Sequence, residues 1–235
     1  MLVAGIDGTK KGWVVVTLDD RKVDVFGVRV ITQALEKLES AAAIAIDMPI
    51  GFLSAAEPGG RGCEKAARAI LGGGRASSVF SSPCRSALSA PDYVSASQAN
   101  RDSSPYGLGL SKQAHAIFPK MREIDLAMTP ATQDRVFEVH PEVCFTELAR
   151  TLDQRINENK KSWGGANQRV DLLEAAGIPL RPLLSQARVW GAATDDVVDA
   201  AVGAWTARRR VLGLASCIPA APQTDAMGLR MEMWV

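Results

Sequence analysis

The first sixteen residues constrain the fold most strongly. Two short apolar runs, residues 2–6 and 14–16, are separated by Asp7, Gly8 and a turn that contains two lysines. Short apolar runs bounded by turn residues are typical of β-strands, and Asp-Gly between two of them is typical of a hairpin. We therefore expect the chain to open with an antiparallel strand pair, with the carboxylate of Asp7 at the end of a buried strand.

The next part of the chain extends this sheet. Residues 23–30 form a third strand candidate, and Thr32 can cap a short helix after it. Residues 42–46 are an unbroken apolar run that ends at Asp47. A run that is apolar on both faces predicts a central strand covered by helices on each side. The predicted order is strand, strand, strand, helix, strand, with an acid after the first and the fourth strand.

Residues 51–130 differ in composition from the part that precedes them. They contain most of the serines and a triple-glycine run, and they lack clear strands. A tract this long without a strand pattern is typical of an insertion, and its regular pieces are helical. Because the chain shows no internal repeat and no low-complexity linker, we predict one domain over residues 1–235 with a helical and loop insertion at residues 51–130.

Clear strand and helix patterns resume after the insertion. Residues 135–140 form a fifth strand candidate that contains Glu138, and the last strong helix is predicted over residues 195–212. Thr194 is its expected cap and Gly213 its expected stop. The predicted fold class is α/β. It is a five-stranded mixed sheet, three antiparallel strands and then parallel strands, flanked by helices, with a largely helical insertion after the fourth strand.

Charge and composition narrow the classes of function. The net charge of +1 excludes the global basic field typical of nucleic-acid-binding domains, and the local pair Lys160-Lys161 is interpreted as a solvated face or a helix end. No apolar run approaches the roughly 20 residues of a membrane span, so we expect a cytoplasmic protein with no membrane partner. The cysteines form no Cys-x-x-Cys pair, which predicts reduced thiols rather than a zinc or redox site. They are Cys63, Cys84, Cys144 and Cys217.

Acidic residues end the strand candidates. If the strands that end at Asp7 and Asp47 are parallel neighbours, both carboxylates emerge at the sheet edge where open α/β sheets bind ligands. Glu138 lies in the fifth strand candidate. The alternative for Asp7 and Asp47 is turn formation, because an Asp side chain can bond its own backbone.

Further acids begin the last helix. Asp196 and Asp199 are three residues apart, so they share one helix face and can converge on one point. Asp195 is four residues from Asp199 and competes for the same role. The alternative is that Asp195 and Asp196 only favour the positive end of the helix dipole.

Clustered carboxylates predict a metal site. Two carboxylates about 4 Å apart repel by roughly 1–4 kcal/mol at effective dielectric constants between those of water and a protein surface. A divalent cation relieves this repulsion, because Mg²⁺ takes oxygen ligands and keeps positions open for a substrate phosphate. Two such ions about 4 Å apart can activate water and stabilise a leaving oxygen. We therefore expect Mg²⁺ or Mn²⁺ as the cofactor.

A set of short motifs runs in order along the chain. They are Gly5-Ile6-Asp7-Gly8, Gly12-Trp13, Ile46-Asp47-Met48-Pro49-Ile50-Gly51, Arg61-Gly62-Cys63-Glu64, Ala67-Arg68, Ser77-Ser78-Val79-Phe80, Gly109-Leu110-Ser111-Lys112-Gln113, Glu138-Val139-His140-Pro141-Glu142 and Asp195 to Ala200. The order of elements resembles the RNase H superfamily, and the start of the last helix resembles a motif of its Holliday-junction resolvases. Over nearly the whole chain, the set is similar to the domain of unknown function 429 family, described as predicted RNase H-like nucleases.

This resemblance implies an RNase H-like fold and a catalytic set of acids. The implied catalytic residues are Asp7, Asp47, Glu138, Asp196 and Asp199. The implied metal ligands are Asp7, Asp47 and Glu138 with Asp199, or with Asp196 in its place. Asp195 and Glu142 are second-choice ligands, since acids are favoured at helix starts in any case.

Several basic residues are candidates for substrate contacts. Arg binds phosphate in a bidentate manner, and a His near a strand end can orient a ligand or move a proton. The candidates are Lys10, Arg61, Arg68, Lys112 and His140.

These observations lead to one functional hypothesis and two alternatives. The hypothesis is a metal-dependent hydrolase, a nuclease that cleaves phosphodiesters of nucleic acid by two-metal chemistry. The alternatives are an ATP-dependent kinase or ATPase of the actin-like fold and a non-catalytic RNase H-like binding module. The turn at Asp7-Gly8-Thr9 is one residue tighter than the Asp-x-Gly-Thr turn of the actin-like fold. Nucleic acid is the expected partner, and formation of a homodimer is left open.

Overall fold

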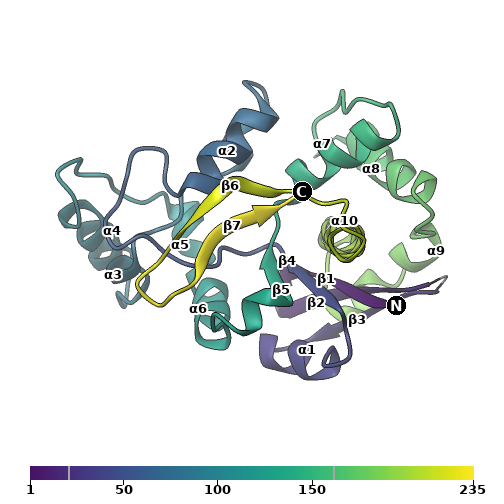
Figure 1. The fold of residues 1–235 in the computed structure, drawn as a ribbon, viewed down its shortest axis with the longest axis horizontal. Helices are drawn as coiled ribbons and strands as arrows, with labels where there is room; N and C mark the ends of the chain where they lie inside the picture. Colours follow the sequence, from purple (N-terminus) through teal and green to yellow (C-terminus); the bar gives the residue numbers. More distant parts are fainter. Residues whose placement is uncertain (21, 161) are drawn as a thin grey trace. The chain divides into compact units, whose positions relative to one another are not determined.

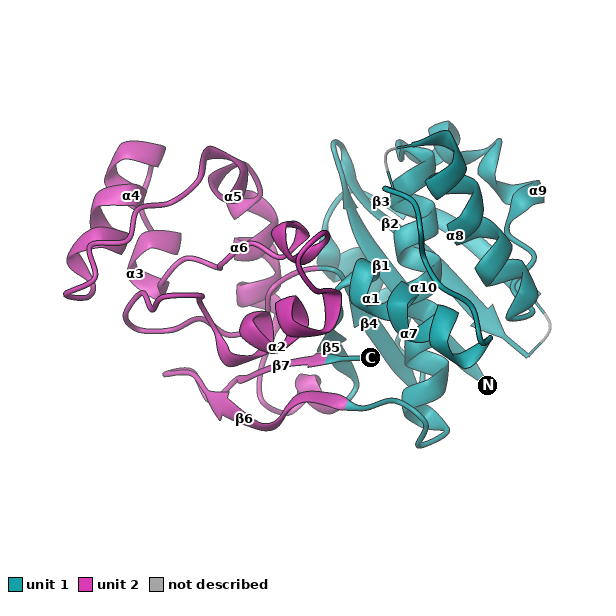
Figure 2. Ribbon diagram, turned by 90° about the horizontal axis from the view of Figure 1, so that it is seen from above, with its two compact units in different colours: residues 1–47, 135–216, 234–235 teal, residues 48–134, 217–233 magenta. Residues whose placement is uncertain are grey.

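The structure, a computed structural model, describes residues 1–20, 22–160 and 162–235. Within these ranges the chain forms two compact units, shown in different colours in Figure 2. Unit 1 contains residues 1–47, 135–216 and 234–235, and unit 2 contains residues 48–134 and 217–233. Unit 2 thus combines the tract that we expected as an insertion with a segment near the C-terminus. The division into one domain with an insertion stays a prediction.

Unit 1 is built on a mixed β-sheet, which in the described residues has five strands in the order β3-β2-β1-β4-β5 (Figure 1). Strands β1, β2 and β3 are antiparallel, whereas β4 is parallel to β1 and β5 is parallel to β4. The predicted fold class is confirmed. The strands are β1 (Leu2–Thr9), β2 (Gly12–Asp19), β3 (Lys22–Val28), β4 (Ala43–Ile46) and β5 (Val136–Glu138).

Helices cover both faces of this sheet. Helix α10 lies across the central strands on one face with α7 and α8 beside it, and α1 lies on the other face (Figure 1). The helical elements of unit 1 are α1 (Ile31–Lys37), α7 (Pro141–Thr151), α8 (Trp163–Ala175), α9 (Arg181–Leu184), the 3₁₀ helix η3 (Ala187–Trp190) and α10 (Thr194–Val211).

Strand β1 continues two residues beyond Asp7, which was its predicted end. Thr9 pairs with Gly12, so the turn is Lys10-Lys11, and Asp7 and Gly8 remain within β1. Asp7 nevertheless lies at the end of the parallel pairing between β1 and β4. The last parallel pair of these strands is Ile6 with Ile46. The backbone N–H of Asp47 donates to the carbonyl of Ile6 at 3.0 Å. Each acid therefore follows directly after the last parallel pair.

Helix α10 approaches the sheet most closely at Gly5. A methyl carbon placed on Gly5 would lie 2.0 Å from the carbonyl oxygen of Ala200 and 2.3 Å from the backbone nitrogen of Ala204. The side of α10 that faces β1 carries small residues because the helix lies so close to the strand. A methyl carbon placed on Gly203 would lie 3.5 Å from the Cα of Gly5. Only glycine on β1 permits this distance between helix and strand.

The two ends of α10 show one wrong and one correct prediction. The residue that precedes the first helical turn is Ala193 rather than Thr194, and its backbone N–H donates to the Asp196 carboxylate at 2.8 Å. An acid in the third helical position can thus satisfy the helix start when the cap residue has no acceptor of its own. Gly213, with a φ of 71°, follows the helix end as expected.

Unit 2 is largely helical, as expected for its main segment. It also contains a two-stranded antiparallel sheet within the described residues, which was not predicted because Pro219 and Pro222 interrupt the strand pattern. The elements are α2 (Gly62–Leu71), η1 (Ala76–Ser78), α3 (Arg85–Leu88), α4 (Tyr93–Asp102), α5 (Lys112–Ala116), α6 (Phe118–Ala127), η2 (Thr132–Asp134), β6 (Cys217–Thr224) and β7 (Arg230–Trp234, which extends into unit 1).

The four cysteines are free thiols, in agreement with the prediction of reduced thiols. In the described ranges, no helix combines the length and the apolar character that crossing a membrane requires.

The close approach of α10 to β1 predicts the effect of a single methyl group. Gly5→Ala should lower the free energy of unfolding by about 1–3 kcal/mol, because the added carbon collides with backbone atoms that cannot move aside independently. Gly73→Ala is the matched control, since nothing lies within 4 Å of its added carbon. Urea denaturation of both variants measures the difference, and equal stability of the two would contradict the packing described for Gly5.

Candidate metal centre

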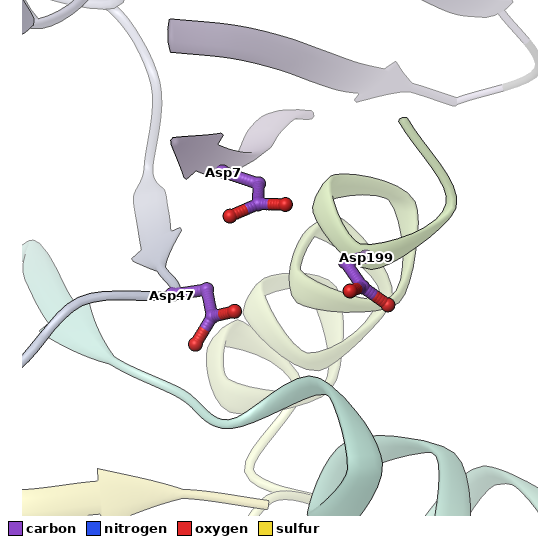
Figure 3. Close-up of side chains that lie close together, drawn as sticks. All are labelled: Asp7, Asp47 and Asp199. Carbon is purple, nitrogen blue, oxygen red and sulfur yellow. The ribbon is translucent and has the colours of Figure 1, made fainter. Parts of the chain in front are cut away.

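Three carboxylates of unit 1 converge at the end of the parallel strands. Asp7 comes from β1, Asp47 directly follows β4, and Asp199 lies in the second turn of α10 (Figure 3). Each offers one oxygen, and these three oxygens lie within 4.8 Å of one another. Asp7 and Asp199 are buried, whereas Asp47 is partly exposed. We call Asp7, Asp47 and Asp199 the acidic triad.

The pleat of the sheet explains why these acids meet. Side chains two residues apart on a strand share a face, so Asp7 is on the face of Gly5 and Asp47 is on the face of Ala45. That face packs against α10. Asp199 immediately precedes Ala200, whose carbonyl makes the closest approach to Gly5. The tight packing of helix on strand therefore places Asp199 opposite the two strand acids.

The triad is electrostatically strained in the absence of a cation. Burial raises the pKa of Asp7 well above its ordinary value of 3.8, and the charges of Asp47 and Asp199 raise it further. Burial and the neighbouring Asp199 raise the pKa of Asp47 to about 8. The backbone N–H of Gly8 donates to Asp7 at 2.6 Å and acts in the opposite direction. The surroundings thus disfavour three negative charges, which is the condition that a bound cation relieves.

One lysine already compensates part of this charge. The ammonium group of Lys160 lies 3.1 Å from Oδ2 of Asp199. Burial opposes the charge on Lys160, but the carboxylates of Asp199, Asp47 and Glu142 together outweigh burial and raise the pKa of the lysine. In Asp199 the effect of burial is larger than that of the lysine, and its pKa rises to about 6. The interpretation of Lys160-Lys161 as a solvated face or helix end does not describe Lys160, which binds Asp199, and Lys161 lies outside the described residues.

The other acids at the start of α10 have different surroundings. Asp196 is half-buried and accepts a hydrogen bond from the backbone of Ala193, so it serves the helix start. The exposed Lys10 is close enough to lower its pKa, although burial raises that pKa overall. Asp195 is exposed. Of the acids in this turn, Asp199 is the one that joins the triad.

The two glutamates that were considered as ligands differ in position. Glu138 ends β5 between Phe137 and Val139, which pack into the core on the α10 side, so the pleat directs Glu138 to the opposite face. Its charge still raises the pKa of Asp47, and its role as a ligand stays a prediction. Glu142 is buried in a bidentate ion pair with Arg169, at 2.7 and 2.8 Å, which joins α7 to α8. That pair gives Glu142 a structural role.

The five candidates for substrate contacts are distributed over both units. In unit 1, Lys10 is exposed in the β1–β2 turn and His140 is the half-buried residue before α7. In unit 2, Arg61 is only 1% exposed, and its guanidinium binds Glu64 and two backbone carbonyls, so it belongs to the core of that unit. Arg68 donates to the carbonyl of Val79, and Lys112 is exposed. Substrate contact by Lys10, Arg68, Lys112 and His140 stays a prediction.

The donor set fits a hard divalent cation. All three triad side chains offer carboxylate oxygens, which Mg²⁺ and Mn²⁺ prefer, and no sulfur or imidazole belongs to the group found among the described residues. The partial exposure of Asp47 leaves one side of the group accessible. The acidic triad is therefore compatible with metal binding.

The fold and the site together define a class of protein. The strand order and directions are consistent with an RNase H-like fold, with an acidic triad at the end of the parallel strands. The model of the family described as "Protein of unknown function (DUF429)" matches residues 5–224, so the chain belongs to this family. A search of curated proteins and a search of solved structures gave no significant match.

The raised pKa values predict how the stability of the metal-free protein depends on pH. Folded Asp47 titrates near pH 8, whereas an unfolded Asp titrates near 3.8. Between these values the folded state binds more protons than the unfolded state, so the free energy of unfolding should fall as the pH rises. Urea denaturation at about pH 5 and about pH 8, with a chelator present, measures this slope. Asp47→Asn should flatten it, and an equal slope in that variant would show that Asp47 is not the titrating group.

Removal of Lys160 should strengthen metal binding. Its ammonium competes with a cation for Asp199, so Lys160→Met is expected to bind Mn²⁺ more tightly, on the order of tenfold, or about 1.4 kcal/mol. Lys37→Met is the matched control, because Lys37 is exposed on α1. Isothermal titration calorimetry measures both affinities, and weaker binding in Lys160→Met would show that the lysine supports the site in another way.

Proposed function

We propose that this protein is a metal-dependent phosphodiesterase that hydrolyses nucleic acid and uses Mg²⁺ or Mn²⁺. The observation that carries the proposal is the convergence of Asp7, Asp47 and Asp199, with oxygens within 4.8 Å of one another at the carboxyl ends of parallel strands. Membership in the family does not supply this function, because the family's description names none. The proposal rests on the chemistry of the site.

The triad would hold the cation, and the rest of unit 1 positions the triad. Asp7 and Asp47 are fixed by adjacent strands, and Asp199 is fixed by the contact of α10 with Gly5. A divalent cation, when bound, supplies the charge that lowers the pKa of a water molecule and stabilises the developing negative charge on a phosphate. Prearranged carboxylates need no reorganisation when it binds, which favours catalysis over a flexible site.

Lys160 and Lys10 would favour an anionic substrate. Lys160 is bound to Asp199 at 3.1 Å and places a positive charge beside the triad. Lys10 is exposed in the β1–β2 turn and lowers the pKa of Asp196 through space. Phosphate groups would therefore meet two cations next to the acids. Since the whole chain has a net charge of only +1, we favour a small or structured nucleic acid over long, sequence-independent DNA binding.

The proposal predicts that Asp7→Asn loses metal-dependent hydrolysis. A bound cation contributes several kcal/mol to such reactions, so the rate should fall by about a thousandfold or more. The assay measures cleavage of single-stranded, duplex and branched oligonucleotides in Mg²⁺ or Mn²⁺. Asp24→Asn is the matched control, because Asp24 is an exposed acid on β3 of the same sheet.

The outcomes of this assay separate the candidate functions. Loss of activity in Asp7→Asn with normal activity in Asp24→Asn supports the nuclease. Equal activity in both variants would mean that the hydrolysis arises elsewhere. Mn²⁺ binding without hydrolysis of any substrate would favour the non-catalytic binding module.

A further inference from the structure

The lysine that binds the acidic triad is more accessible than the carboxylate that it binds. Nζ of Lys160 lies 3.1 Å from Oδ2 of Asp199, and the side chain of Lys160 is 36% exposed whereas that of Asp199 is 9% exposed. The lysine side chain therefore extends from the protein surface to a buried carboxylate of the triad. A group in this position can interact with a ligand that enters from solvent as well as with the triad.

The backbone beside Lys160 is held against helix α8. The carbonyl oxygen of Asn159 accepts from the backbone N–H of Ser162 at 2.9 Å. Gly165, in the first turn of α8, packs so closely that a methyl carbon on it would lie 1.9 Å from the same oxygen. Because Asn159 is fixed in this way, its neighbour Lys160 starts from a defined position. The flexible four-carbon chain of a lysine still allows the ammonium group to move.

A second acid lies near the lysine, but its own ion pair is with an arginine. The charge of Glu142 contributes to the raised pKa of Lys160. Both carboxylate oxygens of Glu142 accept from the guanidinium of Arg169, at 2.8 and 2.7 Å. Arg169 also donates to the carbonyl of Gly165 at 2.8 Å, which fixes the pair. Glu142 therefore attracts the ammonium group through space, while the ion pair of Lys160 is with Asp199.

A bound cation and Lys160 would compete for the same carboxylate. Asp199 is one of the three acids whose oxygens can hold a metal ion, and it is also the partner of the lysine. A divalent cation at the triad would neutralise the negative charge that attracts the ammonium group. The lysine would then be available to another anion, and lysine is a frequent ligand of phosphate groups.

We propose that Lys160 exchanges Asp199 for a phosphate oxygen of the substrate when a divalent cation occupies the acidic triad, so that this lysine couples substrate binding to metal binding. Without substrate, the lysine opposes the cation. With substrate, the same lysine holds the phosphate beside the cation. By linkage, each ligand then raises the affinity of the protein for the other by the same factor. This inference rests on the proposed function, because it assumes that a phosphate group occupies the site.

The test measures the affinity for Mn²⁺ by isothermal titration calorimetry, with and without a dinucleotide that cannot be hydrolysed. The probe is a dithymidine phosphinate, in which methylene groups replace both bridging oxygens and the negative charge remains. Without the probe, Lys160→Met is expected to bind Mn²⁺ about tenfold more tightly than the native protein, because no ammonium group competes for Asp199. With the probe at saturation this advantage should be lost, so that the ratio of the two affinities changes by about tenfold or more.

Two further variants and a neutral ligand make the test specific. Lys160→Arg should behave like the native protein, because arginine keeps the charge and also binds phosphate. Lys37→Met should do the same, because Lys37 is exposed on α1. A dithymidine with an uncharged formacetal linkage should leave the advantage of Lys160→Met unchanged. An advantage of the same size with and without the phosphinate would overturn the exchange, since a permanent ion pair between Lys160 and Asp199 gives that result.

The design separates this inference from the proposed function. Asp7-dependent hydrolysis of bis-p-nitrophenyl phosphate, together with an affinity ratio that the phosphinate does not change, would keep the phosphodiesterase and overturn the exchange. A ratio that changes with the phosphinate, without Asp7-dependent hydrolysis of any substrate, would support the exchange and overturn the phosphodiesterase. Native protein that binds no Mn²⁺ would overturn both.

Discussion

The contact between Gly5 and α10 is the constraint on which the rest of unit 1 depends. A side chain at position 5 would overlap the backbone of Ala200 and Ala204, so the helix can lie this close to the sheet only above glycine. The same contact determines where Asp199 stands, because Asp199 is the residue before Ala200. The geometry of the acidic triad therefore depends on core packing. A change that moves α10 away from β1 would also separate Asp199 from Asp7 and Asp47.

The electrostatics of the site follow from this packing. Burial raises the pKa of all three carboxylates, the neighbouring triad charges raise those of Asp7 and Asp47 further, and Lys160 offsets only part of the negative charge. The oxygen donors of this group fit a divalent cation, which would relieve the repulsion between the carboxylates. Lys160 adds a positive charge beside these carboxylates.

Sequence patterns predicted much of this arrangement, and the errors have physical causes. The apolar runs before Asp7 and Asp47 predicted parallel neighbours with acids at one edge, and helix periodicity placed Asp199 on a face that could meet them. The position of Glu138 relative to the triad depends on strand register, which is determined by pairing between distant residues, and its role as a ligand stays a prediction. Lys160 lies in a loop far along the chain, and its approach to Asp199 is a tertiary contact with no local signal.

The central claim is that Asp7, Asp47 and Asp199 bind a divalent cation together. The most direct measurement is the anomalous difference density of Mn²⁺ in crystals of the protein soaked in that ion. We expect a peak in contact with carboxylate oxygens of all three residues, and we expect it to disappear in crystals of Asp7→Asn. Crystals that contain Mn²⁺ at other surface acids, with no peak at the triad, would contradict the account.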